Sequence, residues 1–204
     1  MTVISILNYG SGNIGAIPNM LKKCGASSRI VSDPAELEMA DKILLPGVGA
    51  FGRAMENLRG KGFVEMLTKK TLVDKVPTLG ICLGMQLLSN GSEENLGVEG
   101  LGWIPGKVCK FRFADRKLKI PHMGWNTIKI RRESPLLKEL DGARFYHVHS
   151  YHYVLDDPEH ELASTFYGYD FPSVINKDNI YGAQFHPEKS HRFGLQLLKN
   201  FAEI

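Results

Sequence analysis

The chain has 204 residues, of which 43% are hydrophobic and 23% are charged. This composition is average for a globular protein and excludes a disordered, collagen-like or coiled-coil chain. The 25 basic and 22 acidic residues leave a formal net charge of +3, which is too small to indicate a nucleic-acid or membrane partner. Because no run approaches the roughly 18 apolar residues of a membrane span and the N-terminus does not resemble a signal peptide, we expect a cytoplasmic protein.

The first third of the chain alternates short apolar strands with helical stretches, which is typical of a parallel sheet covered by helices. We expect strands at residues 3–7, 28–31, 42–45 and 78–81, and helices at residues 14–24, 34–39, 63–70 and 83–88.

The second half is richer in short β-type runs, divided by turn signals. We expect strands at residues 107–113, 127–130, 145–148, 162–167 and 180–185, and a final amphipathic helix from about residue 191. The sequence therefore predicts one flavodoxin-like α/β domain over residues 1–204. Its central, mostly parallel sheet has flanking helices, with extra strands in the C-terminal half.

A basic segment covers residues 107–132, which hold nine Lys and Arg residues and the single acid Asp115. A nucleic-acid patch is one interpretation. Strand-rich hairpins commonly expose such residues on a solvated face, and the segment has few aromatic residues and no recognisable binding module. We favour the solvated face and expect no nucleic-acid partner.

A glycine pattern near the N-terminus, G-x-G-x-x-G over residues 10–15, lies between a predicted strand and a predicted helix. With Asp33 at the end of the next strand, it is compatible with a dinucleotide site. Two residues separate the strand from Gly10, and Pro18 lies in the first turn of the helix, so the loop is longer than that fingerprint requires. Dinucleotide binding is the weaker alternative.

Cys82 is the centre of a G-x-C-x-G sequence, with Gly80 and Gly84 on either side. Glycines at both positions permit a strained strand-to-helix turn that presents the central side chain at the end of the sheet. Unpaired N–H groups at the start of the helix favour a thiolate. A buried structural cysteine is the alternative, since free cysteines are often buried.

His186 and Glu188 are separated by Pro187, directly after a predicted strand. Pro187 disfavours a helical conformation for His186, and in an extended segment residues i and i+2 point to the same side. A carboxylate at one ring nitrogen fixes the tautomer of an imidazole and stabilises the imidazolium. An exposed ion pair is the alternative, but together with Cys82 these residues form a candidate nucleophile, base and orienting group.

Six segments resemble a known family: residues 80–86 (GICLGMQ), 184–190 (QFHPEKS), 45–49 (LPGVG), 121–126 (PHMGWN), 148–151 (VHSY) and 8–13 (NYGSGN). The first two look like the motifs of class I, triad-type glutamine amidotransferases. All six, in order and across nearly the whole chain, resemble the glutaminase subunits of imidazole glycerol phosphate synthases, which act in histidine biosynthesis.

The resemblance implies that Cys82 attacks the side-chain amide of L-glutamine, with His186 as acid and base and Glu188 as its orienting group. It places the oxyanion hole at the N–H of Leu83 and in the Gly47-Val48-Gly49 segment, and implies no cofactor or metal. The glutamine pocket is expected to include Gly49, Gln86, Glu94, His149, Ser150 and Tyr151. The alternatives are a surface helix residue for Gln86 and a solvated loop acid for Glu94.

The implied partner is a (β/α)8 cyclase subunit, which uses the ammonia and forms a heterodimer with the glutaminase. The residues expected at that interface are Asn13, Trp125, Tyr146 and Lys189. His147 stands where these subunits are expected to have Phe, and residues 15–18 (GAIP) also differ. A paralogous glutaminase feeding another synthase, such as one of cell-surface sugar biosynthesis, is therefore the alternative.

Overall fold

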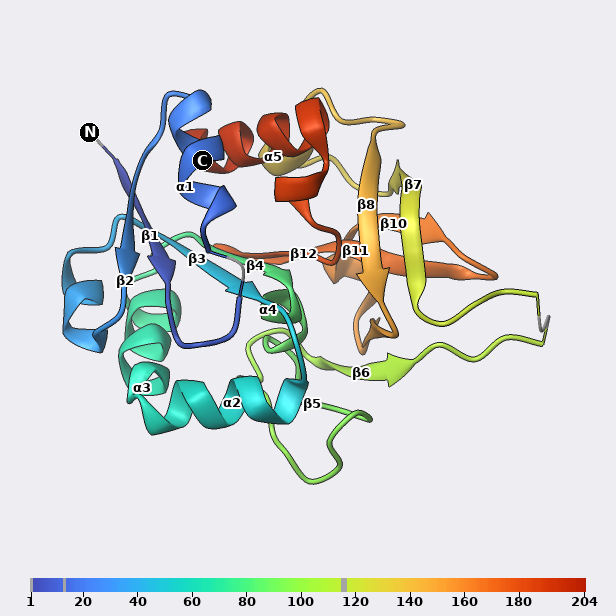
Figure 1. Ribbon diagram of the computed structural model, residues 1–204, viewed down its shortest axis with the longest axis horizontal. Helices are drawn as coiled ribbons and strands as arrows, with labels where there is room; N and C mark the ends of the chain where they lie inside the picture. Colours follow the sequence, from blue (N-terminus) through green and yellow to red (C-terminus); the bar gives the residue numbers. More distant parts are fainter. Residues whose placement is uncertain (1, 13, 115–116) are drawn as a thin grey trace.

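A nine-stranded sheet runs through the computed structural model, which describes residues 2–12, 14–114 and 117–204 (Figure 1). Its strands, in spatial order, are β2 (Ser27–Val31), β1 (Val3–Leu7), β3 (Lys42–Gly47), β4 (Thr78–Cys82), β12 (Ile180–Ala183), β11 (Asp170–Lys177), β10 (Glu161–Phe166), β7 (His122–Ile130) and β8 (Arg144–His149). A smaller sheet joins β5 (Gly91–Ser92), β6 (Gly106–Lys110) and β9 (Tyr151–Leu155).

The large sheet has a parallel half and an antiparallel half. The pairs from β2 to β12 are parallel, and those from β12 through β11, β10 and β7 to β8 are antiparallel. Strands β3 and β4 are buried along their whole length, as expected for parallel strands covered on both faces. The α/β fold class, with extra strands in the C-terminal half, is confirmed.

Helices cover both faces of the parallel half (Figure 1). Helices α1 (Ala16–Lys23) and α5 (His191–Glu203) lie on one face, and α2 (Phe51–Gly60) and α3 (Phe63–Thr68) lie on the other; α4 (Leu83–Gln86) follows β4. Short 3-10 helices at Pro34–Met39, Pro135–Leu137, Pro158–His160 and Pro187–Lys189 and a π-helix at Lys69–Val73 complete the helical segments. Within the described residues, none of these helices combines the length and apolar character needed to cross a membrane.

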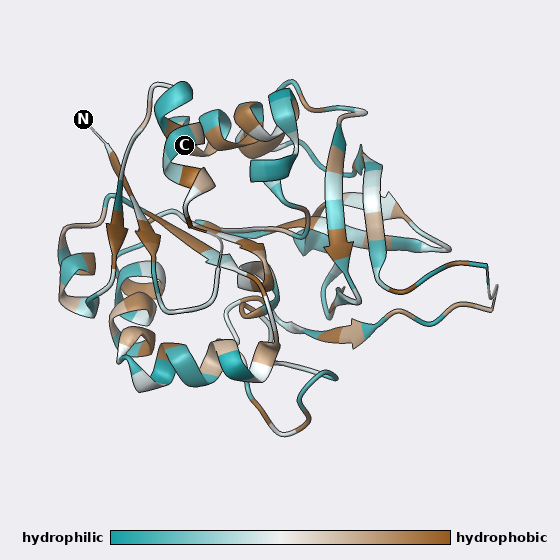
Figure 2. Cartoon of the chain, in the orientation of Figure 1, coloured by the Kyte–Doolittle hydropathy of each residue, from teal (hydrophilic) through white to brown (hydrophobic). Residues whose placement is uncertain are grey.

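The core consists of two hydrophobic clusters separated by the sheet. Leu45 points to the cluster shared with α2 and α3, and its neighbour Leu44 to the cluster shared with α1 and α5. This alternation follows from the two-residue period of a strand. Figure 2 shows the hydrophobic parallel strands and the polar outer faces of the helices that cover them.

Some elements differ from the sequence prediction. Helix α2 was not predicted, although its buried Phe51, Ala54, Met55 and Leu58 have the i, i+3, i+4, i+7 spacing of an amphipathic helix. Strands β9 and β11 were also not predicted, and β11 contains Pro172, a residue that argues against an interior strand. The segment 34–39 is a 3-10 helix rather than an α-helix.

The described basic residues of segment 107–132 are exposed, as expected for a solvated face. Arg112 lies 3.0 Å from a carboxylate oxygen of Glu93, and Arg131 lies 2.7 Å from one of Asp170. The glycine-rich segment 10–15 is described except for Asn13, and Asp33 caps the following 3-10 helix by accepting a hydrogen bond from the N–H of Ala35.

Candidate active site

Three neighbouring parallel strands, β3, β4 and β12, end at the same edge of the sheet. The register pairs Gly47 with Cys82 and Ala183 with Ile81. Cys82 therefore lies at this edge between Gly47 and the segment that leads from β12 to His186. The carboxyl ends of parallel strands are the usual position of ligand sites in α/β sheets.

The predicted turn at Cys82 is present. Cys82 has φ 53° and ψ −110°, at the junction of β4 and α4. A Cβ on Gly84 would overlap the carbonyl oxygen of Leu45, and a Cβ on Gly80 would lie 2.6 Å from the carbonyl oxygen of Gly84. Only glycine fits these two positions, so the turn depends on both. The helix that follows has four residues, shorter than the predicted segment 83–88.

His186 is hydrogen-bonded to Glu188 deep inside the protein. The distance between His186 Nδ1 and Glu188 Oε1 is 2.7 Å, and the two side chains are 3% and 6% exposed. The alternative of an exposed ion pair is thus excluded. His186 is extended, as expected, with φ −102° and ψ 98°, but the extended segment does not continue, because Glu188 lies in a 3-10 turn over Pro187–Lys189. Pro187 starts that turn, which brings the carboxylate back to the imidazole.

The electrostatic environment of His186 favours the imidazolium. Burial lowers the pKa of His186, but interactions with the sulfur of Cys82 and the carboxylate of Glu188 outweigh burial and raise it to about 10. An imidazolium next to a cysteine sulfur stabilises a thiolate. Cys82, His186 and Glu188 thus place a thiol, an imidazole and a carboxylate in sequence, the arrangement that a nucleophile, a proton carrier and an orienting group require.

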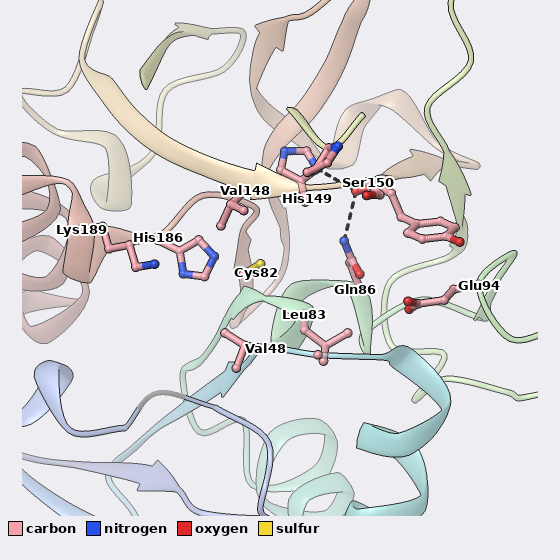
Figure 3. A pocket seen from close by; sticks show the side chains of 13 residues that line it. Val48, Cys82, Leu83, Gln86, Glu94, Val148, His149, Ser150, His186 and Lys189 are labelled. Atoms are coloured by element: carbon pink, nitrogen blue, oxygen red, sulfur yellow. Dashed lines mark hydrogen bonds between the residues drawn. The ribbon is translucent and has the colours of Figure 1, made fainter. Parts of the chain in front are cut away.

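A pocket of about 390 Å³ opens above Cys82 (Figure 3). Its volume lies in the range typical of sites for small molecules. The residues that line it are Val48, Gly49, Cys82, Leu83, Gln86, Glu94, Pro121, Val148, His149, Ser150, Tyr151, His186 and Lys189. All six residues expected to bind glutamine are among them. Glu188 is not, because it lies behind His186.

Gln86 is buried in this pocket, which excludes the alternative of a surface helix residue. Its side-chain amide donates to the carbonyl oxygen of Tyr151 at 3.2 Å, and His149 Nδ1 lies 2.8 Å from the same oxygen (Figure 3). Glu94 accepts a hydrogen bond of 2.8 Å from the N–H of Phe51, the first residue of α2, so it is anchored rather than merely solvated.

Gln184 is a residue of the site that the sequence prediction missed. It is fully buried, its amide nitrogen lies 3.8 Å from the sulfur of Cys82, and its amide oxygen accepts from Gln86 at 3.1 Å. Its position two residues before His186, just after a strand, was the signal available in the sequence. Residues at i and i+2 share a side of an extended segment.

The segment expected to contribute to an oxyanion hole borders Cys82. Leu83 and Val48 line the pocket, whereas Gly47 lies beneath it, where a Cβ would be 2.8 Å from both the N–H nitrogen of Gly84 and the hydroxyl of Tyr9. Gly49 has φ +104°, a conformation that L side chains rarely adopt.

Three of the residues expected at a partner interface lie together beside the pocket. The rings of Trp125 and Tyr146 are 6.2 Å apart, and Lys189 Nζ lies 5.4 Å from the centre of the Tyr146 ring. Trp125 is 38% exposed and also stacks on His191 at 5.3 Å. The fourth, Asn13, lies outside the described residues.

The chain is similar to glutamine amidotransferases over nearly its whole length. The family model for class I glutamine amidotransferases matches residues 5–204. The chain is 48% identical to imidazole glycerol phosphate synthase subunit HisH 2 of Methanococcus maripaludis, with 98% of each chain covered. It is 45% identical to subunit HisH 2 of Pseudomonas aeruginosa, covering 99% of this chain and all of that protein.

Solved structures of lower identity share the fold. The structure of PurLQS from Thermotoga maritima matches with a TM-score of 0.77 at 16% identity, covering 99% of this chain and 98% of the other. A crystal structure of a glutamine amidotransferase matches with a TM-score of 0.72 at 18% identity, covering 96% of this chain and 98% of the other.

Proposed function

The chain belongs to the class I glutamine amidotransferases, and we propose that it hydrolyses L-glutamine to glutamate and ammonia with Cys82 as the nucleophile. The observation that carries this proposal is the alignment of Cys82, His186 and Glu188 at one pocket. The strained turn presents the sulfur, and the 2.7 Å contact with Glu188 fixes the imidazole.

In the first half of the reaction, the Cys82 thiolate attacks the side-chain amide carbon of glutamine. The C–N bond then breaks as the His186 imidazolium gives its proton to the leaving nitrogen, so that ammonia departs and a glutamyl thioester remains. The raised pKa of His186 supports this assignment, because the acid must hold a proton before the attack.

In the second half, neutral His186 takes a proton from water, and the resulting hydroxide attacks the thioester carbonyl. The C–S bond breaks, which releases glutamate and restores the thiolate and imidazolium. Glu188 stabilises the imidazolium without transferring a proton itself.

Both tetrahedral intermediates carry an oxyanion that needs N–H donors. We assign this role to the N–H of Leu83 and to an N–H of the Gly47-Val48-Gly49 segment, which border the sulfur from two sides. The glycines of this segment permit the peptide reorientation that would aim the second donor. Losing one such donor typically lowers turnover by about 10² to 10³.

The glutamine pocket selects the amino-acid end of the substrate. Gln86 uses its amide nitrogen for Tyr151 and Gln184, which leaves its oxygen as the acceptor for the α-ammonium group. Glu94, Gly49, His149, Ser150 and Tyr151 complete the pocket around that end.

The partner we propose is the (β/α)8 cyclase subunit of imidazole glycerol phosphate synthase, which uses the ammonia to make imidazole glycerol phosphate and AICAR in histidine biosynthesis. The names of relatives that are 44–48% identical over nearly the full chain support this partner. The half-exposed Trp125, with Tyr146 and Lys189, is a suitable contact surface next to the pocket.

The test is to measure glutamate release by the chain alone and with the cyclase and its nucleotide ligand. We expect slow release by the isolated chain, strong stimulation in the liganded complex, and weaker stimulation of Trp125→Ala and Lys189→Ala. If the chain is active but is stimulated by another ammonia-using synthase and not by the cyclase, it belongs to the paralogous group. A chain that binds NAD and ignores glutamine would contradict the proposal.

A further inference from the structure

Three histidines form a buried cluster next to the glutamine pocket, on the paired strands β7 and β8. His147 and His149 are two residues apart on β8, so their side chains share one face of the sheet. His122 on β7 pairs directly with His149 across the antiparallel ladder. The three side chains are between 0% and 6% exposed.

The ring nitrogens of this cluster converge. One nitrogen from each ring lies within 4.8 Å of the others, and His147 Nδ1 is 3.2 Å from His149 Nε2. Two ligands of a tetrahedral zinc ion with Zn–N bonds of 2.0–2.1 Å are about 3.3 Å apart. The pair on β8 therefore already has the spacing of two zinc ligands.

Two nitrogens of the cluster, His122 Nδ1 and His147 Nε2, are buried and have no hydrogen-bond partner. Leaving a buried polar atom unpaired is costly. A metal ion bound within the cluster would give His122 Nδ1 a partner, whereas His147 Nε2 would stay unpaired. On His149, the other nitrogen, Nδ1, is 2.8 Å from the carbonyl oxygen of Tyr151. That contact fixes a proton on Nδ1 and leaves the lone pair of Nε2 directed at His147, which is the support that metal-bound histidines usually have.

The three imidazoles lie in buried, partly aromatic surroundings. The ring of Phe171 lies 5.9, 6.0 and 5.3 Å from those of His122, His147 and His149. Burial of an imidazole disfavours its charged form, and neutral imidazole is the form that binds metals.

We propose that His122, His147 and His149 bind a transition-metal ion of the zinc class, with water as the fourth ligand. His149 binds through Nε2 and His147 through Nδ1, whose proton moves to its own Nε2. The ring of His122 rotates to bring Nδ1 to the ion, and the proton of Nδ1 moves to Nε2. His122 Nε2 then loses its 3.3 Å contact with the side-chain nitrogen of Asn126. The side-chain nitrogen of Asn126 keeps its 2.8 Å hydrogen bond to the carbonyl oxygen of Phe166.

The site is separate from the proposed nucleophile but borders the same pocket through His149. His147 is the residue that turns a pair of histidines into a three-ligand set, and it does not line the pocket. Replacing His147 by Phe, the residue expected there from the family resemblance, therefore removes the metal site without removing a residue that we assign to glutamine binding.

The experiment is calorimetric titration of metal-free full-length protein with Zn²⁺, combined with the visible absorption spectrum after addition of Co²⁺. We expect one Zn²⁺ per chain and the intense absorption bands of tetrahedral Co²⁺. His147→Phe should lose affinity at least tenfold and lose the Co²⁺ bands. If circular dichroism shows that His147→Phe does not fold, His122→Asn takes its place, and we expect the same losses from it.

Two control variants separate this site from other metal-binding groups. Cys82→Ser removes the sulfur that interacts with His186, and His160→Gln removes a histidine outside the cluster. Both should bind Zn²⁺ like the unmodified protein. The proposal is overturned if the unmodified protein binds no Zn²⁺, if folded His147→Phe or His122→Asn binds it equally well, or if Cys82→Ser abolishes binding.

Discussion

Glu188 Oε1 lies 2.7 Å from His186 Nδ1, and both side chains are sealed from solvent, although the two residues are only two positions apart in a tight 3-10 turn. A hydrogen bond of this kind between buried groups fixes the ring and leaves Nε2 as the nitrogen that can exchange a proton. The geometry thus assigns different tasks to the two residues, and they can be separated by mutation.

Glu188→Gln is expected to lower glutamine turnover less than His186→Ala does. The amide retains a hydrogen bond to Nδ1 but not the charge that stabilises the imidazolium, whereas alanine removes the proton carrier. Steady-state glutamate release in the liganded complex measures both effects. If both variants lose the same activity and circular dichroism shows that Glu188→Gln is unfolded, Glu188 has a structural role instead.

The pKa of His186 also predicts how stability depends on pH. Its value is about 10 in the folded protein, against an ordinary value near 6.5 in the unfolded chain, so the folded state binds the proton more tightly. This stabilisation is complete below about pH 6.5 and is lost as the pH rises toward 10. The difference in unfolding free energy between the unmodified protein and His186→Gln should therefore shrink over that range in urea titrations. A difference that grew with pH would show that the imidazole is neutral in the folded state.

Gln184 is expected to promote the reactivity of Cys82. Its amide nitrogen lies 3.8 Å from the sulfur, and Gln86 holds its oxygen on the other side. Gln184→Glu replaces a donor by a negative charge, and a hydrogen bond to a charged group is worth about 1.5–3 kcal/mol, so alkylation of Cys82 by iodoacetamide at pH 7 should slow at least about tenfold. Gln196→Glu, on α5, is the matched control. Equal alkylation rates for the two variants would show that Gln184 does not affect the reactivity of Cys82.

Gly84→Ala should destabilise the fold strongly, because the added Cβ overlaps the carbonyl oxygen of Leu45. We expect a loss of more than about 2 kcal/mol in unfolding free energy, as for other overpacked sites. Gly60→Ala, at the end of α2, meets nothing within 4 Å and should be neutral or stabilising by up to about 1 kcal/mol. Similar urea midpoints for both variants would mean that the turn tolerates a side chain at residue 84.

The sequence was sufficient to predict features of the site that depend on residues close together in the chain. The turn at Cys82 follows from glycines two positions away on each side, and the contact between His186 and Glu188 follows from their separation, although the turn that achieves it was not predicted. The family resemblance identified the six expected glutamine-binding residues, and all of them line one pocket.

Features that depend on the pairing of distant strands could not be predicted in this way. Gln184 reaches Cys82 because β12 lies parallel to β4, a register that no local pattern specifies. The histidine cluster likewise depends on the pairing of His122 with His149 across β7 and β8. Strand β11 contains Pro172, and a proline argues against an interior strand. In the structure Pro172 nevertheless lies opposite Ser164 of β10 in the antiparallel pair.

The central claim, that Cys82 is the nucleophile of a glutaminase, is tested most directly by covalent trapping. The chain in its liganded complex is treated with a glutamine-analogue diazoketone, and the modified residue is identified by peptide mass spectrometry while glutamate release is followed. We predict one label per chain, on Cys82, with loss of glutamine hydrolysis in proportion to labelling and protection by excess glutamine. A label on Cys24 or Cys109, or full glutaminase activity with Cys82 modified, would contradict the account.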